Sequence, residues 1–239
     1  ISGSKTWNDA DNQDGKRPES ITINLLADGK VIDTVEVTEE DGWAWEFNEL
    51  PKYRDHGTEI VYTVNEEAVE GYEATVDGYD VTNTHEVEKT EVSGSKTWAD
   101  ENDQDGLRPE SITINLLADG EVIDTVTVTE ADEWAWEFDN LPKYRDHGTE
   151  IVYTITEEIV EGYETVVDGF NVTNSHETEK VDIAGSKTWA DADDQDGIRP
   201  GSIVINLLAD GEVVDTKTLT ESDGWAWSFT ELDKYRVHG

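Results

Sequence analysis

The 239-residue sequence contains no cysteine and no methionine. Disulfide bonds and thiol chemistry are therefore excluded, and a small domain of this chain lacks the usual covalent staple. Basic residues are also scarce, with 17 Lys and Arg against 57 Asp and Glu, which gives a formal net charge of −40. Because so acidic a surface repels nucleic acid and anionic lipid, we expect neither as a partner.

The sequence also lacks long apolar runs. None is long enough to span a membrane, and the N-terminus shows no signal-peptide pattern, so we expect no membrane insertion by this segment. Dense negative charge can indicate disorder. Nine Trp and eight Tyr, set among segments of alternating polar and apolar residues, instead predict a folded chain.

An internal repeat dominates the sequence. Evenly spaced copies of one lysine and one tryptophan mark it: Lys5, Lys96 and Lys187, and Trp43, Trp134 and Trp225. We place the repeats at residues 1–88, 89–179 and 180–239. Short charged segments at 85–91 and 176–182 link them, and these segments should be extended and semi-rigid because they contain no glycine or proline.

Each repeat has the pattern of β structure throughout. In the first repeat, alternating segments are separated by turn signals such as Asp28-Gly29 and Asp41-Gly42, and no segment has helical periodicity. We count about seven short strands in roughly 90 residues, which is the size and spacing of a β-sandwich. We therefore predict an all-β chain of tandem seven-stranded β-sandwiches. So small a domain should be only modestly stable unless something staples it.

The first strand of each repeat places a lysine on its apolar face. In the first repeat this face consists of Ile1, Gly3, Lys5 and Trp7, while small hydroxylated residues occupy the other face. An ammonium group is costly to bury unless it is paired or loses its charge. The inward lysine therefore needs a partner or a chemical role.

Two further polar residues interrupt the apolar faces of other strands. Glu66 ends the apolar face of the strand at 60–66, and Asn83 ends that of the strand at 79–83. The second repeat has the same three polar residues at the same parity: Lys96, Glu157 and Asn174. Each complete repeat thus directs a lysine, a glutamate and an asparagine into its core from three strands.

The residues alone leave two interpretations open. In the first, lysine and glutamate form a buried ion pair and asparagine satisfies the remaining donors. In the second, the lysine amine attacks the asparagine carboxamide and expels ammonia, which leaves an isopeptide bond. Burial favours this reaction because it lowers the pKa of a lysine and keeps a glutamate protonated, ready to polarise the amide and relay protons. Folding would hold the reactants at an effective concentration of about 10⁵–10⁸ M.

Four stretches carry a resemblance to a known family. They are GSKTWNDADNQDGKRPESI at 3–21, LPKY at 50–53, YTVNE at 62–66 and VTNT at 81–84. The sequence resembles the B-type repeat of Gram-positive collagen adhesins, the CnaB domain. The resemblance implies a transthyretin-like, inverse immunoglobulin-like sandwich in an extracellular surface protein that is anchored to the cell wall.

The resemblance also implies roles for the inward polar residues. Its isopeptide lysine matches Lys5 and Lys96, its asparagine matches Asn83 and Asn174, and its catalytic acid matches Glu66 and Glu157. The third repeat departs from the pattern, because it has Lys187 but its Glu and Asn strands would lie past Gly239. We therefore expect Lys187 to stay unpaired. We also expect that the chain continues or that another chain supplies the missing strands.

We predict a structural function for the chain. Repeats of this family usually form a stalk, with neighbouring repeats as partners and a separate domain that binds the host ligand. Crosslinking happens once per repeat, so we expect no enzyme with turnover and no cofactor. The alternative is a ligand-binding module that contacts a host matrix protein or glycan. Trp43 and Trp45 share parity with the core face and are poor candidates for a surface stack.

The acidic loop after the first strand leaves one question open. Asp9, Asp11 and Asp14 precede Gly15, which invites a calcium site, but the spacing departs from that of an EF-hand. We favour a solvated turn and predict no metal site. His56 and His147 are isolated in the sequence from other candidate metal ligands. We therefore expect them to have a structural role in loops and not to bind zinc.

Overall fold

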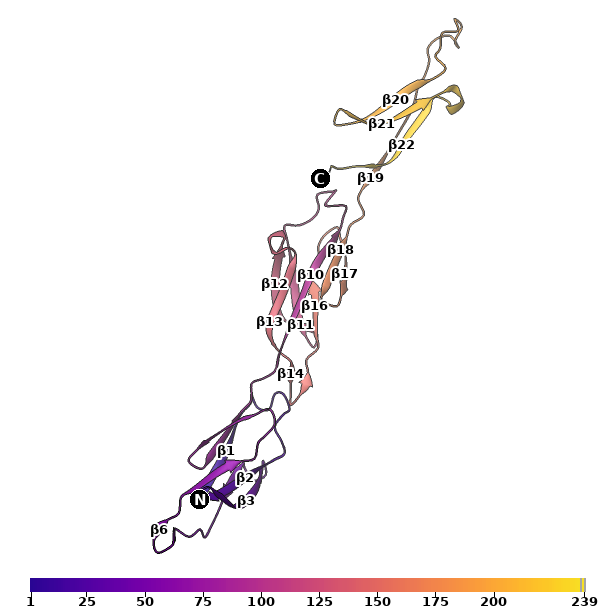
Figure 1. The fold of residues 1–239 in the computed structure, drawn as a ribbon. Helices are drawn as coiled ribbons and strands as arrows, with labels where there is room; N and C mark the ends of the chain where they lie inside the picture. Colours follow the sequence, from indigo (N-terminus) through magenta and orange to yellow (C-terminus); the bar gives the residue numbers. More distant parts are fainter. Residues whose placement is uncertain (237, 239) are drawn as a thin grey trace. The chain divides into compact units, whose positions relative to one another are not determined.

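The structure is a computed structural model of the chain that describes residues 1–236 and 238 (Figure 1). Nearly all of its regular structure is β, with two short 3₁₀ turns, η1 (Glu130–Asp132) and η2 (Glu221–Asp223). The predicted all-β class is thereby confirmed. No helix in the described ranges is both long enough and apolar enough to cross a membrane.

Backbone contacts group the chain into two compact units. One unit comprises Ile1–Gly94, Ile114–Val126 and Ala135–Thr156, and the other comprises Ser95–Thr113, Thr127–Trp134 and the chain from Glu157 onward. The first repeat lies in the first unit, and residues of the second repeat occur in both. The division into three repeats at the predicted boundaries stays a prediction, and its end point, Gly239, lies outside the described residues.

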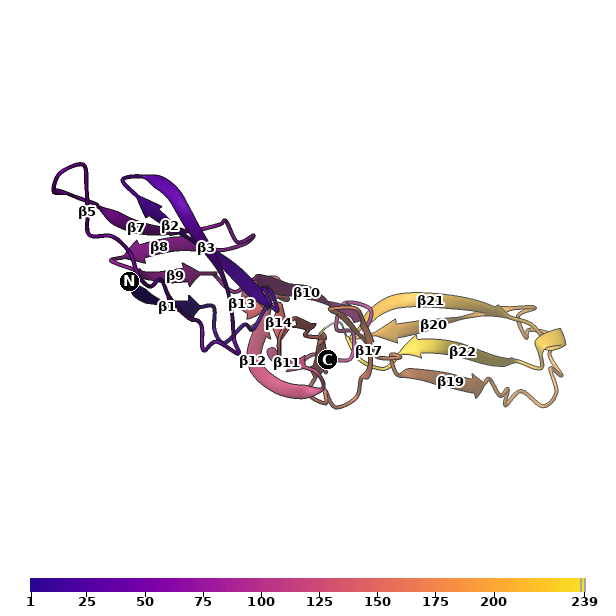
Figure 2. The same cartoon turned by 90° about the horizontal axis from the view of Figure 1, so that it is seen from below.

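The first repeat contains nine strands: β1 (Ser2–Asn8), β2 (Ser20–Ala27), β3 (Lys30–Thr38), β4 (Ala44–Glu46), β5 (Tyr53–Arg54), β6 (Thr58–Glu59), β7 (Tyr62–Glu66), β8 (Glu73–Asp77) and β9 (Asp80–Thr84). Apart from the two-residue pair β5–β6, they are the seven strands expected from the alternation. They form a sheet with the order β4-β1-β9-β8 and a second sheet with the order β3-β2-β7 (Figure 2).

The first strand of the repeat, β1, pairs with two other strands of its sheet. The first half of β1 pairs antiparallel with β4, with Gly3 opposite Trp45. Its second half pairs parallel with β9, the last strand, with Lys5 opposite Val81. The repeat therefore begins and ends on neighbouring strands of one sheet.

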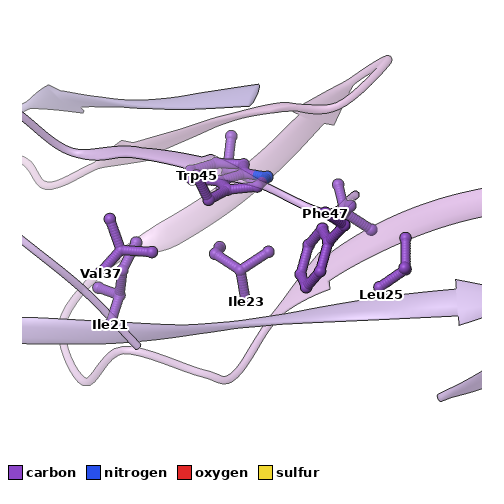
Figure 3. Close-up of a cluster of buried hydrophobic side chains, with 8 residues drawn as sticks. Ile21, Ile23, Leu25, Val37, Trp45 and Phe47 are labelled. Atoms are coloured by element: carbon purple, nitrogen blue, oxygen red, sulfur yellow. The ribbon is translucent and has the colours of Figure 1, made fainter. Parts of the chain in front are cut away.

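The core of the first repeat lies between its two sheets. Trp45 and Phe47 face Ile21, Ile23 and Leu25 in Figure 3, and all five side chains are buried. Each comes from an alternating segment, so the period-two pattern identified the core correctly. Trp45 is only 5% exposed, so its ring is part of the core and not of the outer surface.

The second repeat has the same order of strands: β10 (Lys89–Ala99), β11 (Ser111–Ala118), β12 (Glu121–Thr129), β13 (Ala135–Pro142), β14 (Tyr144–Arg145), β15 (Thr149–Glu150), β16 (Tyr153–Glu157), β17 (Glu164–Asp168) and β18 (Asn171–Ser175). Its first and last strands, β10 and β18, again pair in parallel. Because β10 begins at Lys89, the predicted linker at 85–91 is shorter than expected and its second half belongs to a strand.

The third repeat has four described strands: β19 (Lys180–Ser186), β20 (Ile203–Ala209), β21 (Glu212–Leu219) and β22 (Ala226–Asp233). They pair as β19–β22 and β20–β21. The inner-face residues Ile203, Ile205 and Leu207 are half-buried, although their counterparts in the first repeat are fully buried. Strand β19 starts at Lys180, so the linker predicted at 176–182 is also partly strand.

The acidic loop after β1 is a buried hydrogen-bonded cluster, and the expected solvated turn is wrong for two of its residues. Asp9 is 2% exposed and Asp14 is 6% exposed. Asp9 accepts hydrogen bonds from Arg17 at 2.7 and 3.1 Å and from the Tyr72 hydroxyl at 2.8 Å. Protein donors thus occupy both Asp9 oxygens, and Arg17 supplies the positive charge.

Asp14 ties the same loop to the segment that follows β9. Its Oδ2 accepts a hydrogen bond from the Glu88 backbone N–H at 2.7 Å and lies 2.8 Å from His85 Nε2. His85 Nδ1 in turn lies 2.7 Å from the Gly71 carbonyl oxygen. Sequence reasoning missed this anchoring role of His85, whereas His56, singled out from the sequence, lies in an exposed turn.

The Asp9 cluster makes stability depend on pH. Burial raises the pKa of Asp9, but hydrogen bonds from Arg17, from the Asn12 N–H and from Tyr72 together outweigh burial, so the pKa lies below its usual value. A carboxyl group whose folded-state pKa is lowered stabilises the fold above its unfolded pKa of about 3.9. That stabilisation is lost as the pH falls through the folded-state pKa.

We expect Asp9→Asn to lower the free energy of unfolding of the first repeat by about 2 kcal/mol at neutral pH. The variant should also show a flatter dependence of that free energy on pH below about 4. Urea unfolding followed through amide NMR signals of the first repeat measures both effects. Glu19→Gln, at an exposed position nearby, is the control. Equal pH dependence in wild type and Asp9→Asn would contradict the assignment.

Candidate functional site

The site is built around Lys5, which β1 directs into the space between the two sheets. Its side chain is 0% exposed. The Lys5 Nζ atom lies 4.6 Å from the centre of the Trp7 ring, the next residue on the same face. On the other side is Gly3, where a Cβ atom would lie 2.0 Å from the Tyr79 carbonyl oxygen. Only glycine allows β1 to approach the start of β9 so closely.

Glu66 reaches the lysine from the opposite sheet. It is the last residue of β7, and its Oε1 lies 2.8 Å from Lys5 Nζ. The glutamate side chain is 1% exposed, so the contact is closed to water. The predicted meeting of these two residues is therefore what the structure shows.

Asn83 approaches from the neighbouring strand. In the parallel pairing of β1 with β9, Asn83 lies opposite Trp7, one step of the two-residue period beyond Lys5. Asn83 is 0% exposed, and neither atom of its amide group has a hydrogen-bond partner among the described residues. The interpretation in which asparagine satisfies leftover donors is thus not what the structure contains. An unpartnered buried polar group costs about 1–3 kcal/mol.

The electrostatics of the site lower the pKa of the lysine amine. Burial lowers the pKa of Lys5, and the nearby Glu66 carboxylate offsets part of that effect. The same balance, with burial as the larger effect, lowers the pKa of Lys96 in the second repeat. A smaller fraction of each lysine is therefore ammonium than in water, which makes the amine a better nucleophile.

The second repeat contains the same site. Lys96 Nζ donates a hydrogen bond to Glu157 Oε1 at 2.7 Å, and both side chains are 0% exposed. Asn174 is 0% exposed, lies opposite Trp98 on the parallel neighbour, and has no partner for its amide atoms within the described ranges. One contact is new, because Thr165 Oγ1 donates to Glu157 Oε2 at 3.0 Å.

A wall of aromatic residues closes the site. Trp7 packs edge-on against Trp43 and Tyr72, with ring centroids 5.2 and 5.0 Å apart. Burial, followed by its hydrogen bond to Asp9, raises the pKa of Tyr72, so its hydroxyl stays protonated and donates. Sequence reasoning missed this wall. The sequence contained a signal for it, because Lys5, Trp7 and Asp9 alternate with other residues and so would lie on the same face of one strand.

The described residues of the third repeat do not assemble this site. Lys187 is exposed, and its Nζ donates to the Thr188 carbonyl oxygen at 2.9 Å and lies 4.6 Å from the Trp189 ring centre. No carboxylate pairs with it among residues 1–236 and 238. Lys187 therefore keeps the packing against tryptophan seen at Lys5 but has no paired acid in the described part of the chain.

Comparisons with known proteins agree with this architecture. The family model of the Cna protein B-type domain matches residues 1–84, 92–175 and 183–239. A collagen adhesin of Staphylococcus aureus is 42% identical over 242 residues, covering 98% of this chain and 20% of the adhesin. The chain thus spans about a fifth of the length of that relative.

A solved structure of two repeats gives the same result. The crystal structure of two B repeat units of the Staphylococcus aureus collagen-binding protein is 39% identical, covers 99% of this chain and 65% of its own, and has a TM-score of 0.58. The crystal structure of a single B repeat unit of that protein is also 39% identical. The match covers 74% of this chain and 97% of the single-repeat chain, with a TM-score of 0.36. With three copies of the family model matched from residue 1 to residue 239, the chain belongs to the Cna protein B-type domain family.

Proposed function

We propose that this chain is a stalk segment of a surface adhesin and that each complete repeat closes itself with a lysine–asparagine isopeptide bond. One observation carries the proposal. Both complete repeats bury a lysine of lowered pKa against a buried glutamate, beside an asparagine whose amide has no other partner in the described structure. The crosslinks would join Lys5 to Asn83 and Lys96 to Asn174.

The reaction is an amide exchange. The neutral Lys5 amine attacks the Asn83 Cγ atom, and Glu66, in its protonated form, donates to the amide oxygen as negative charge develops there. The new C–N bond forms, the Cγ–Nδ2 bond breaks, and Glu66 carries the proton lost by the amine to the departing nitrogen. One ammonia molecule leaves, and the glutamate is restored.

Folding supplies most of the catalysis. The three groups come from two sheets and meet only when the sandwich forms, which converts a slow reaction between separate molecules into a reaction between positioned neighbours. The product consumes its own lysine and asparagine, so each repeat reacts once. The chain is therefore not an enzyme in the sense of turnover, and the chemistry requires no cofactor.

The position of the bond suits a stalk. Lys5 lies on the first strand of the repeat and Asn83 on the last, and these strands are parallel neighbours. A pull on the two ends of the repeat would shear their hydrogen bonds, and a covalent link between them would carry that load. The intervening strands β2 to β8 would then remain folded under force, heat or proteolysis.

The setting follows from the relatives as a proposal. We place the chain outside the cell in a Gram-positive surface protein anchored to the cell wall, with neighbouring repeats as its partners. A host ligand would be bound by another domain. The rival role, an aromatic platform for a matrix protein or glycan, is disfavoured because Trp45 is buried and Trp43 packs against Trp7.

The first test of the proposal is the intact mass of the chain. We expect it to be lower than the sequence mass by two ammonia molecules, one for each complete repeat. Peptide mapping should recover Lys5 joined to Asn83 and Lys96 joined to Asn174, while Lys187 appears only in linear peptides. A mass equal to that of the uncrosslinked chain would rule the bonds out.

The second test removes the acid from one repeat. Glu66→Gln should fold but leave Lys5 and Asn83 unjoined, because loss of a general acid–base group slows such a step by about 10²–10⁴-fold. The intact mass should then be short by a single ammonia. The second repeat, with Glu157 unchanged, is the internal control. Full yield of both bonds would show that Glu66 has another role.

The third test measures the stability that the bond provides. Asn83→Ala removes the crosslink but keeps the Lys5–Glu66 pair. By analogy with disulfides, loss of a closure spanning almost the whole repeat should cost about 4–5 kcal/mol. Differential scanning calorimetry should show a lower melting temperature for the first repeat only, and Asn174→Ala should do the same to the second. Unchanged melting in both variants would mean that the bonds are absent or contribute nothing.

A further inference from the structure

The two complete sites differ at one side chain that touches the glutamate. In the second repeat, Thr165 Oγ1 donates to Glu157 Oε2 at 3.0 Å. The corresponding position of the first repeat is Ala74, which has no hydroxyl group. As a result, Glu66 Oε2 is buried with no hydrogen-bond partner among the described residues.

The register of the strands shows that these positions are equivalent. Thr165 on β17 lies opposite Asn174 on β18, and Ala74 on β8 lies opposite Asn83 on β9. Each is therefore directly beside the asparagine of its site. The glutamate comes from the other sheet, so the threonine hydroxyl bridges the two sheets at the reacting centre.

The glutamate that contacts the threonine has more hydrogen bonds than its counterpart in the first repeat. Glu157 accepts hydrogen bonds at both oxygens, from Lys96 at Oε1 and from Thr165 at Oε2. At Glu66, neither oxygen has a hydrogen-bond partner among the described residues, and Oε1 forms only an ion-pair contact with Lys5 Nζ at 2.8 Å. A carboxyl group anchored at one oxygen presents the other in a fixed direction, whereas an unanchored one loses rotational freedom when the reaction begins.

We propose that Thr165 is a positioning residue for the crosslinking reaction and that its hydroxyl makes the second repeat close faster than the first. This inference rests on the proposed function. The hydroxyl holds Glu157 Oε2, so that Oε1 stays directed at the Lys96 amine from which it takes the proton. Thr165 loses no proton and forms no covalent bond. It acts only through Glu157.

Paired substitutions in the full 239-residue chain test the inference. Thr165→Val keeps the shape of the side chain and removes the hydroxyl, Thr165→Ser keeps the hydroxyl, and Ala74→Thr adds one to the first repeat. Cell-free translation, with samples stopped in acidic urea at successive times, yields chains of known age. Mass spectrometry of digests then gives the crosslinked fraction of each repeat separately.

The expected result is a rate that follows the hydroxyl group. A hydrogen bond of ordinary strength corresponds to a rate change of roughly 2- to 10-fold. Thr165→Val should slow the second repeat by that factor, Thr165→Ser should restore it, and Ala74→Thr should speed the first repeat. The crosslinking rate of the unaltered repeat in each variant is the internal reference. Dividing by it removes differences between variants in the synthesis or folding of the chain.

Two outcomes would overturn the inference and separate it from the proposed function. If both repeats crosslink but Thr165→Val and Thr165→Ser have equal rates, and Ala74→Thr changes nothing, the hydroxyl has no positioning role while the isopeptide proposal stands. If the wild-type chain shows no crosslinked peptide in either repeat, both fail. Because Ala74→Thr adds a group instead of removing one, it decides the matter even if Thr165→Val impairs folding of the second repeat.

Discussion

The burial of one lysine amine between two sheets is the constraint on which each complete repeat depends. Lys5 has a fully buried side chain, and its nearest charged neighbour is Glu66 at 2.8 Å. Such an arrangement is stable only if the amine keeps its pairing or gives up its charge. The close approach of β1 to β9, the ring of Trp7 and the end of β7 from the second sheet surround that group.

A second buried cluster lies beside the site. Asp9 follows Trp7 on the inward face of the same segment and binds Arg17 and Tyr72, and Tyr72 packs on Trp7. The site and the acidic loop therefore share one aromatic pair. A carboxylate would be expected to stay in solvent. Asp9 can be buried because Arg17 and the Tyr72 hydroxyl donate hydrogen bonds to it.

The linker also gains order from this loop. Asp14 binds the Glu88 N–H and His85, and in the second repeat Asp105 binds the Glu179 N–H at 2.8 Å and His176 at 2.9 Å. A charged segment without glycine or proline would be extended in any case. The carboxylates hold it to the fold through its backbone, which composition alone does not specify.

The sequence by itself determined the all-β class, the repeat, the core faces and the parity of Lys5, Glu66 and Asn83, because side-chain direction in a strand follows a strict two-residue period. Only the tertiary structure decided that β1 and β9 are parallel neighbours, that Asp9 and Asp14 are buried, and that Thr165 touches Glu157. These features join residues that are distant in sequence. Strand pairing and sheet packing bring them together, and neither produces a local periodic pattern in the sequence. The alternation could predict that three polar groups point inward, but only packing could show that Glu66 reaches Lys5 from the other sheet.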